Sequence, residues 1–212
     1  MSHIFDFLFG QYKTYESLHI ILEIIAVFFG LLSVWFSKQN NILVYPTGMI
    51  STSIFVYLLL KWGLLGDMLI NGYYFLMSIY GWYIWTRKVD ADHVTPISKT
   101  TKKEQQISVT IFIAALIFVY VVYRTFDKWT SWTAYVDTLT TAVFFVGMWL
   151  MAKRKIENWI YWIIGNIISV PLYFFKGLTF TSLQYFIFTI IAFYGYQAWK
   201  KNLDKNPVIL SK

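Results

Sequence analysis

The sequence predicts an all-α membrane protein with seven transmembrane helices arranged as three, one and three. Of its 212 residues, 58% are hydrophobic and only 14% are charged, and the mean hydropathy is +0.53. A soluble domain carries about 25% charged residues. The apolar stretches are also long enough for helices, which need about 20 residues to cross the hydrocarbon core, and they do not alternate like barrel strands. An internal repeat, described below, then sets the grouping of the helices.

Seven apolar stretches define the expected spans. They cover residues 18–36, 42–60, 67–86, 107–125, 136–152, 158–175 and 181–199. The first three spans form one unit, 18–86, and the last three form a second unit, 136–199. The span 107–125 is then a linker helix between the two units.

The segments outside the spans are polar or short. Residues 1–17 lack the basic region and cleavage site of a signal peptide, and their apolar side chains share one helical face, so we expect a short interfacial helix there. Residues 87–106 are expected to form a cytoplasmic loop. Residues 200–212 are expected to form a cytoplasmic tail.

The two units are related by a shift of 114 residues, which needs no gap. The matched pairs are Glu23/Asp137, Trp35/Trp149, Ile42/Ile156, Ile50/Ile164, Val56/Val170, Gly63/Gly177, Tyr80/Tyr194, Gly81/Gly195 and Trp85/Trp199. Three spans plus one linker span give both units the same orientation, so the repeat is parallel. Transporters with such repeats bind their substrates near mid-membrane between the units, and the repeat therefore favours a transporter.

The net charge of +7 is carried by residues between the spans. Thirteen of the eighteen lysine and arginine residues fall on the side of the C-terminus. The positive-inside rule places that side in the cytoplasm and the N-terminus outside. The basic charge thus predicts contact with a lipid bilayer and not with a nucleic acid.

Several chemistries are absent from the sequence. There is no cysteine, and the three histidines are scattered, without the spacing of a metal site. There is no nucleophile elbow and no phosphate-binding loop. We therefore expect no metal, no cofactor and no enzymatic activity.

The sixth span carries an unusual polar and aromatic face. Trp159, Trp162 and Asn166 lie three and four residues apart, which places them on one side of a helix. A polar side chain at that depth is costly unless it faces a partner, the bundle interior or water. These three residues are the first candidates for substrate contact. The alternative is structural: Trp159 belongs to an interfacial aromatic belt, and Asn166 bonds another helix.

Other polar side chains at membrane depth are weaker candidates. Secondary lining residues are Thr52, Asn71, Thr181, Gln184 and Tyr185. Three carboxylates, Glu23, Asp67 and Asp137, lie near the outer ends of their spans and could form an outer vestibule that attracts a cation. Each of them could equally be a hydrated residue at a helix end.

The stretch NWIYWIIGN followed by IISVPLYFFKGL resembles the signature of the PnuC family of bacterial vitamin transporters. The motif is Trp-x-x-Trp-x-x-x-Asn, carried here by Trp159, Trp162 and Asn166. The resemblance implies a SWEET-like fold, location in the bacterial inner membrane, facilitated diffusion by alternating access, and a homotrimer. It also implies a functional link to a cytoplasmic nicotinamide riboside kinase, whose product is trapped in the cell.

The expected cargo is nicotinamide riboside, a precursor of NAD, because relatives import it and because two indoles suit a cationic ring. Thiamine or riboflavin is the alternative within the family. A membrane enzyme or scaffold without transport is the alternative outside it. Met148 stands where the resemblance leads us to expect a glutamine, which leaves the vitamin open.

Overall fold

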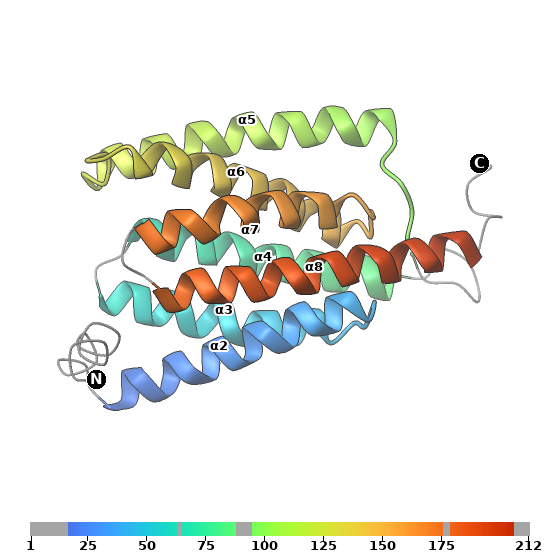
Figure 1. Cartoon of the computed structure of the whole chain (residues 1–212), viewed down its shortest axis with the longest axis horizontal. Helices are drawn as coiled ribbons and strands as arrows, with labels where there is room; N and C mark the ends of the chain where they lie inside the picture. Colours follow the sequence, from blue (N-terminus) through green and yellow to red (C-terminus); the bar gives the residue numbers. More distant parts are fainter. Residues whose placement is uncertain (1–16, 63–64, 88–94, 176–178, 206–212) are drawn as a thin grey trace.

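The computed structural model describes residues 17–62, 65–87, 95–175 and 179–205, and its secondary structure is helical (Figure 1). The helices are α2 (Ser17–Lys38), α3 (Val44–Lys61), α4 (Leu65–Thr86), α5 (Lys102–Thr125), α6 (Thr133–Ala152), α7 (Asn158–Phe175) and α8 (Thr179–Lys205). By length and composition, five of them, namely α2, α3, α5, α6 and α7, are apolar enough to cross a membrane. Together with large apolar side chains exposed on the outer surface, this composition is that of a multi-pass membrane protein.

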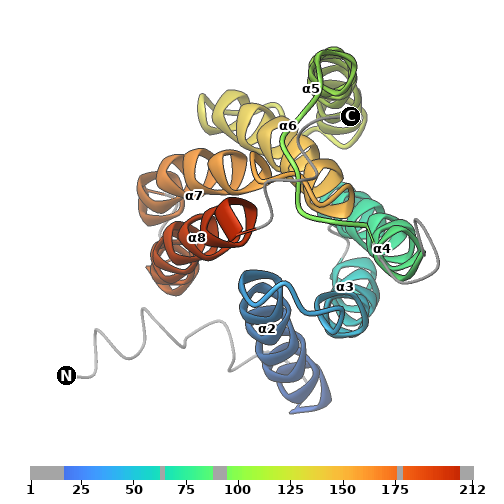
Figure 2. The same ribbon diagram turned by 90° about the vertical axis from the view of Figure 1, so that its right-hand side faces the viewer.

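Six helices form a closed ring. Within the first unit, α2 packs on α3 and α3 on α4; within the second, α6 packs on α7 and α7 on α8. The ring is closed by two equivalent contacts between the units, α4 with α6 and α8 with α2. Viewed along the helices, the two units face each other and α5 lies outside the ring against α6 (Figure 2). The predicted arrangement of three, one and three helices is confirmed.

The repeat extends to backbone conformation. Asn40 and Arg154 are equivalent under the shift of 114 residues, and both adopt a left-handed backbone, with φ values of 56° and 55°. They also meet, because Arg154 Nε donates a hydrogen bond of 3.1 Å to Asn40 Oδ1. Two equivalent residues touch only where the axis that relates the units passes between them. The axis that relates the two units therefore passes between Asn40 and Arg154.

The same end of the bundle contains pairs of aromatic side chains that obey the repeat. Trp85 Nε1 donates to the Met151 carbonyl at 3.2 Å, and its equivalent Trp199 donates to the Ser37 carbonyl at 3.0 Å. Each bond runs from one unit to the other, and Ser37 and Met151 are themselves equivalent. We call this end of the bundle, with Tyr45, Trp85, Trp159 and Trp199, the tryptophan end.

Arg154 connects three parts of the chain at the tryptophan end. Besides Asn40, it donates a hydrogen bond to the Thr95 carbonyl, and its guanidinium lies 4.2 Å from the Trp85 ring centroid. Burial lowers the pKa of Arg154 from its ordinary value. A buried cation depends on its partners, since water no longer solvates it.

Replacing Arg154 by glutamine should lower the free energy of unfolding by on the order of 2 kcal/mol, because charge-assisted hydrogen bonds are lost. The measurement is the thermal unfolding midpoint in detergent, with Lys201→Gln on the exposed part of α8 as the control. Equal midpoints for the two variants would show that Arg154 does not hold the units together.

The helix ends differ most from the sequence prediction at two places. The helix α5 begins at Lys102 and not at 107, because Thr101 and Glu104 form a capping box: Thr101 Oγ1 accepts from Glu104 N at 3.2 Å, and Thr101 N donates to Glu104 Oε2 at 2.9 Å. The helix α8 continues to Lys205 and not 199, since Leu203 packs in the core at the tryptophan end. The expected interfacial helix at 1–17 lies almost entirely outside the described residues.

Candidate functional site

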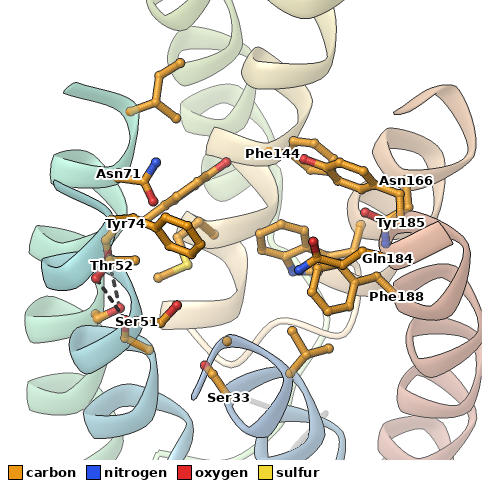
Figure 3. Close-up of a pocket in the computed structure, with 18 of the residues that line it drawn as sticks. Ser33, Ser51, Thr52, Asn71, Tyr74, Phe144, Asn166, Gln184, Tyr185 and Phe188 are labelled. Carbon is orange, nitrogen blue, oxygen red and sulfur yellow. Dashed lines mark hydrogen bonds between the residues drawn. The ribbon is translucent and has the colours of Figure 1, made fainter. Parts of the chain in front are cut away.

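A cavity of about 570 Å³ lies between the two units. Residues from all six ring helices line it, and α5 contributes Tyr123. Figure 3 shows its two sides: Ser51, Thr52, Asn71 and Tyr74 of the first unit face Asn166, Gln184, Tyr185 and Phe188 of the second. The position of the cavity is the one expected for a parallel repeat.

The second unit contributes a row of aromatic rings, which we call the aromatic wall: Trp162, Phe144, Tyr185 and Tyr173. The Phe144 ring stacks on Trp162 with a centroid distance of 5.4 Å and on Tyr185 with 6.0 Å. Tyr185 stacks in turn on Tyr173 at 5.0 Å. These rings all line the cavity. Aromatic side chains that line a cavity suit a ligand with a ring of its own, which can pack against them.

A glycine makes room for the centre of the aromatic wall. A Cβ on Gly165 would lie 2.2 Å from a carbon of the Phe144 ring, whereas one on Gly147 would lie 3.5 Å from the Trp162 indole, which is an ordinary contact distance. The Phe144 ring therefore occupies space that a larger residue at position 165 would fill.

The first unit has the opposite distribution of size. Phe144 and Gly165 correspond to Gly30 and Ser51, and Trp162 and Gly147 correspond to Gly48 and Ser33. In each case an aromatic residue and a glycine of the second unit correspond to a glycine and a serine of the first. Within the first unit, Gly30 faces Ser51 and Gly48 faces Ser33. At these paired positions the first unit thus carries small side chains where the second carries aromatic rings.

The predicted site residues are largely brought together by the fold. Trp159, Trp162, Asn166, Thr52, Asn71, Gln184 and Tyr185 all line the cavity. The side chain of Thr181 lies outside the part of the chain whose side chains the structure describes. The roles of all these predicted residues in substrate binding stay predictions.

Trp159 and Trp162 share a face of α7 but lie at different depths. Trp159 is 2% exposed, and its ring lies against Gly195, where a Cβ would be 2.5 Å away, and edge-to-face with Trp199 at 5.6 Å. Its equivalent Tyr45 lies in the same way against Gly81. Trp159 and Tyr45 close the cavity at the tryptophan end, whereas Trp162 and the 3% exposed Asn166 lie along its side.

Two carboxyl side chains lie at the opposite end of the cavity. Glu23 and Asp137, equivalent under the repeat, both line it there. The side chain of Asp67 is not among those described. No lysine or arginine occurs among the described lining residues.

Sequence reasoning missed Phe144, Phe188, Ser33, Ser37 and Ser78, all of which line the cavity. The signal that could have found Phe144 is its mismatch with Gly30 within an otherwise well-matched repeat. Met148, singled out by sequence, also lines the cavity and packs in the core beneath it. Within the described residues there is no group of three or more side chains that could hold a metal ion.

Comparison with known proteins gives the family. The family described as "Nicotinamide mononucleotide transporter" matches residues 20–201. The nicotinamide riboside transporter PnuC of Escherichia coli (strain K12) is 25% identical over 206 residues, covering 84% of each chain. The riboflavin/roseoflavin transporter RibM of Streptomyces davaonensis is 25% identical over 137 residues, covering 63% of this chain and 64% of that one.

A solved structure shows the same fold. The crystal structure of the vitamin B3 transporter PnuC superposes with a TM-score of 0.65 at 24% identity, covering 87% of this chain and 82% of the other. The resemblance inferred from the Trp-x-x-Trp-x-x-x-Asn motif is confirmed, and so are the SWEET-like fold class and the expectation of a transporter and not an enzyme. The chain belongs to the nicotinamide mononucleotide transporter family, the PnuC family of vitamin transporters.

Proposed function

We propose that this chain imports nicotinamide riboside across the bacterial inner membrane by facilitated diffusion. The observation that carries the proposal is the pairing of an aromatic wall with a cavity that holds two carboxylates and, among its described lining residues, no cationic side chain. The riboside has a planar pyridinium ring with a fixed positive charge. An indole face is the best aromatic partner for such a ring, contributing up to about 2 kcal/mol when desolvated.

The charge of the cavity supports the riboside over its phosphorylated form. A mononucleotide carries a phosphate, for which proteins supply arginine, lysine or helix N-termini. Glu23 and Asp137 would repel that phosphate while attracting the pyridinium. The unphosphorylated vitamin is thus the better match.

Asn166 supplies the polar recognition in this proposal. Its amide has both donors and an acceptor, as does the carboxamide of nicotinamide. It lies on the second-unit side of the cavity, beside Tyr185 (Figure 3). A ring stacked on the aromatic wall would bring its carboxamide within reach of the same face of α7.

Transport would follow from movement of one unit against the other around this cavity. With the C-terminus in the cytoplasm, the tryptophan end faces the cytoplasm and the end with Glu23 and Asp137 faces outward. Phosphorylation by a cytoplasmic riboside kinase would then trap the product, because the added phosphate makes it a poor ligand for the same cavity. A homotrimeric assembly belongs to this proposal as well.

Riboflavin is the second candidate, favoured by the relationship to RibM and by the length of the aromatic wall, and thiamine is the third. Calorimetric titration of the detergent-purified protein with each of the three vitamins tests the proposal. We expect micromolar binding of the riboside alone, equivalent to about −8 kcal/mol. Binding of riboflavin or thiamine alone would reassign the cargo, and binding of none would overturn the proposal.

Asn166→Leu should weaken riboside binding about tenfold, because the substitution removes both hydrogen-bonding functions at similar bulk and leaves the carboxamide unpaired. Gln197→Leu, on the exposed face of α8, is the matched control and should bind like the wild type. Unchanged affinity in Asn166→Leu would exclude Asn166 as a ligand.

A further inference from the structure

Five serine and threonine side chains of the first unit line the cavity. Ser37 donates to Met151 Sδ of the second unit at 3.3 Å. We call the other four the hydroxyl wall: Ser33, Ser51, Thr52 and Ser78. Each donates its hydrogen to a backbone carbonyl. The bonds are Ser33 Oγ to Val44 O at 2.7 Å, Ser51 Oγ to Ala26 O at 2.7 Å, Thr52 Oγ1 to Gly48 O at 2.8 Å and Ser78 Oγ to Tyr74 O at 2.8 Å.

These bonds determine what the wall can offer a ligand. A hydroxyl has one hydrogen to donate and two lone pairs that accept. Since the hydrogen is already directed at a carbonyl, each oxygen retains its capacity to accept. The hydroxyl wall is therefore an array of acceptors, and its best ligand is a group that donates several hydrogen bonds.

The hydroxyl wall exists in one unit only. The positions equivalent to Ser33, Ser51, Thr52 and Ser78 are Gly147, Gly165, Asn166 and Ala192. Two of the four hydroxyls also bond within their own helices, a role that serine and threonine take in many membrane helices. Thr140 and Thr141 of the second unit also line the cavity, but the two units differ at all four positions of the hydroxyl wall. Ser51 and Thr52 lie on the cavity side opposite the aromatic wall (Figure 3).

We propose that the hydroxyl wall is a sugar subsite, which accepts hydrogen bonds from the hydroxyls of a ribose while the attached ring stacks on the aromatic wall. The cargo then lies across the two units, with its sugar on the first and its ring on the second. This inference rests on the proposed function, because it assigns the two halves of a nucleoside to the two sides of the cavity.

The test compares two ligands that share a ring. Nicotinamide riboside carries the sugar on its ring nitrogen. In 1-methylnicotinamide a methyl group replaces the sugar on that nitrogen, so both rings have the same positive charge. Thr52→Val and Ser33→Ala should each weaken riboside binding about fivefold, and their combination about 25-fold, as expected for one net hydrogen bond each. The affinity for 1-methylnicotinamide should not change in these variants.

Two further variants control the comparison. Ser53→Ala removes the neighbouring hydroxyl, which is exposed, donates to the Ile50 carbonyl at 3.0 Å and lies outside this cavity; it should leave both affinities unchanged. Thr52→Ser keeps the hydroxyl and should bind the riboside like the wild type. Thermal unfolding midpoints of all variants separate lost affinity from lost folding.

The outcomes separate the two proposals. No riboside binding by the wild-type protein would overturn the proposed function. Riboside binding by the wild type with equal affinity in Thr52→Val and Ser33→Ala, or equal losses for both ligands, would overturn the sugar subsite alone. Loss of riboside binding in Thr52→Ser would also overturn it, because that variant retains the acceptor.

Discussion

Replacing Trp162 by alanine should weaken binding of nicotinamide riboside by about 30-fold. The indole lies at one end of the aromatic wall, stacked on Phe144 and adjacent to Gly147. A cation–π contact with a desolvated indole contributes about 2 kcal/mol, which corresponds to that ratio of affinities. Calorimetric titration and saturable uptake into proteoliposomes measure the effect.

Two control variants show whether the effect requires an indole and whether it is specific to position 162. Trp162→Phe keeps an aromatic face and should lose less affinity than alanine, since indole is the stronger cation–π partner. Trp82→Ala removes an indole that is 43% exposed on α4 and does not line the cavity, and it should bind normally. An affinity within twofold of wild type for Trp162→Ala would mean that the ring of the cargo binds elsewhere.

Replacing Gly165 by alanine should both destabilise the protein and weaken binding. The new Cβ would lie 2.2 Å from a carbon of Phe144, and Phe144 is held between Trp162 and Tyr185. The Phe144 ring must then move out of the aromatic wall. Overpacking of this kind lowers the free energy of unfolding by about 1–3 kcal/mol. We expect riboside affinity to fall about tenfold, as for the loss of one aromatic contact.

The same substitution elsewhere gives a matched control. Gly72 also lies in a helix, but a Cβ there would meet no atom within 4 Å, so Gly72→Ala should be neutral or slightly stabilising. Combining Gly165→Ala with Phe144→Leu removes the clash and should restore stability without restoring affinity. Full affinity in that double variant would show that Phe144 does not contact the cargo.

Hydropathy alone located the helices, because seven long apolar runs separated by charged loops allow few other solutions. Each predicted span coincides with a helix, and the errors lie at ends such as Lys102 and Lys205, where capping and core packing extend a helix beyond its apolar run. The repeat predicted that the cavity would lie between the units. The Trp-x-x-Trp-x-x-x-Asn face was also visible, since spacing decides which residues share a side of a helix.

Other features of the site depend on contacts between helices and could not be read from one helix at a time. Spacing put Trp159 and Trp162 on one face, but it could not show that Trp159 closes the end of the cavity against Gly195. Identities such as Trp85 and Trp199 make the repeat visible, whereas the shape of the cavity comes from exchanges such as Gly30 for Phe144. The sequence singled out Thr52 as a lining residue, but it shows nothing about where the hydrogen of a hydroxyl points, so it could not predict the hydroxyl wall as an array of acceptors.

The crossed bonds at the tryptophan end have a mechanical consequence. Trp85 and Trp199 each tie one unit to the other, through Met151 and Ser37 respectively. A motion that parts the units there stretches both bonds together, whereas Tyr45 and Trp159 stay packed on Gly81 and Gly195, which belong to their own units. Packed contacts of this kind switch between discrete arrangements and do not deform gradually. We therefore expect the two bonds to break together when this end opens, since the repeat makes them equivalent.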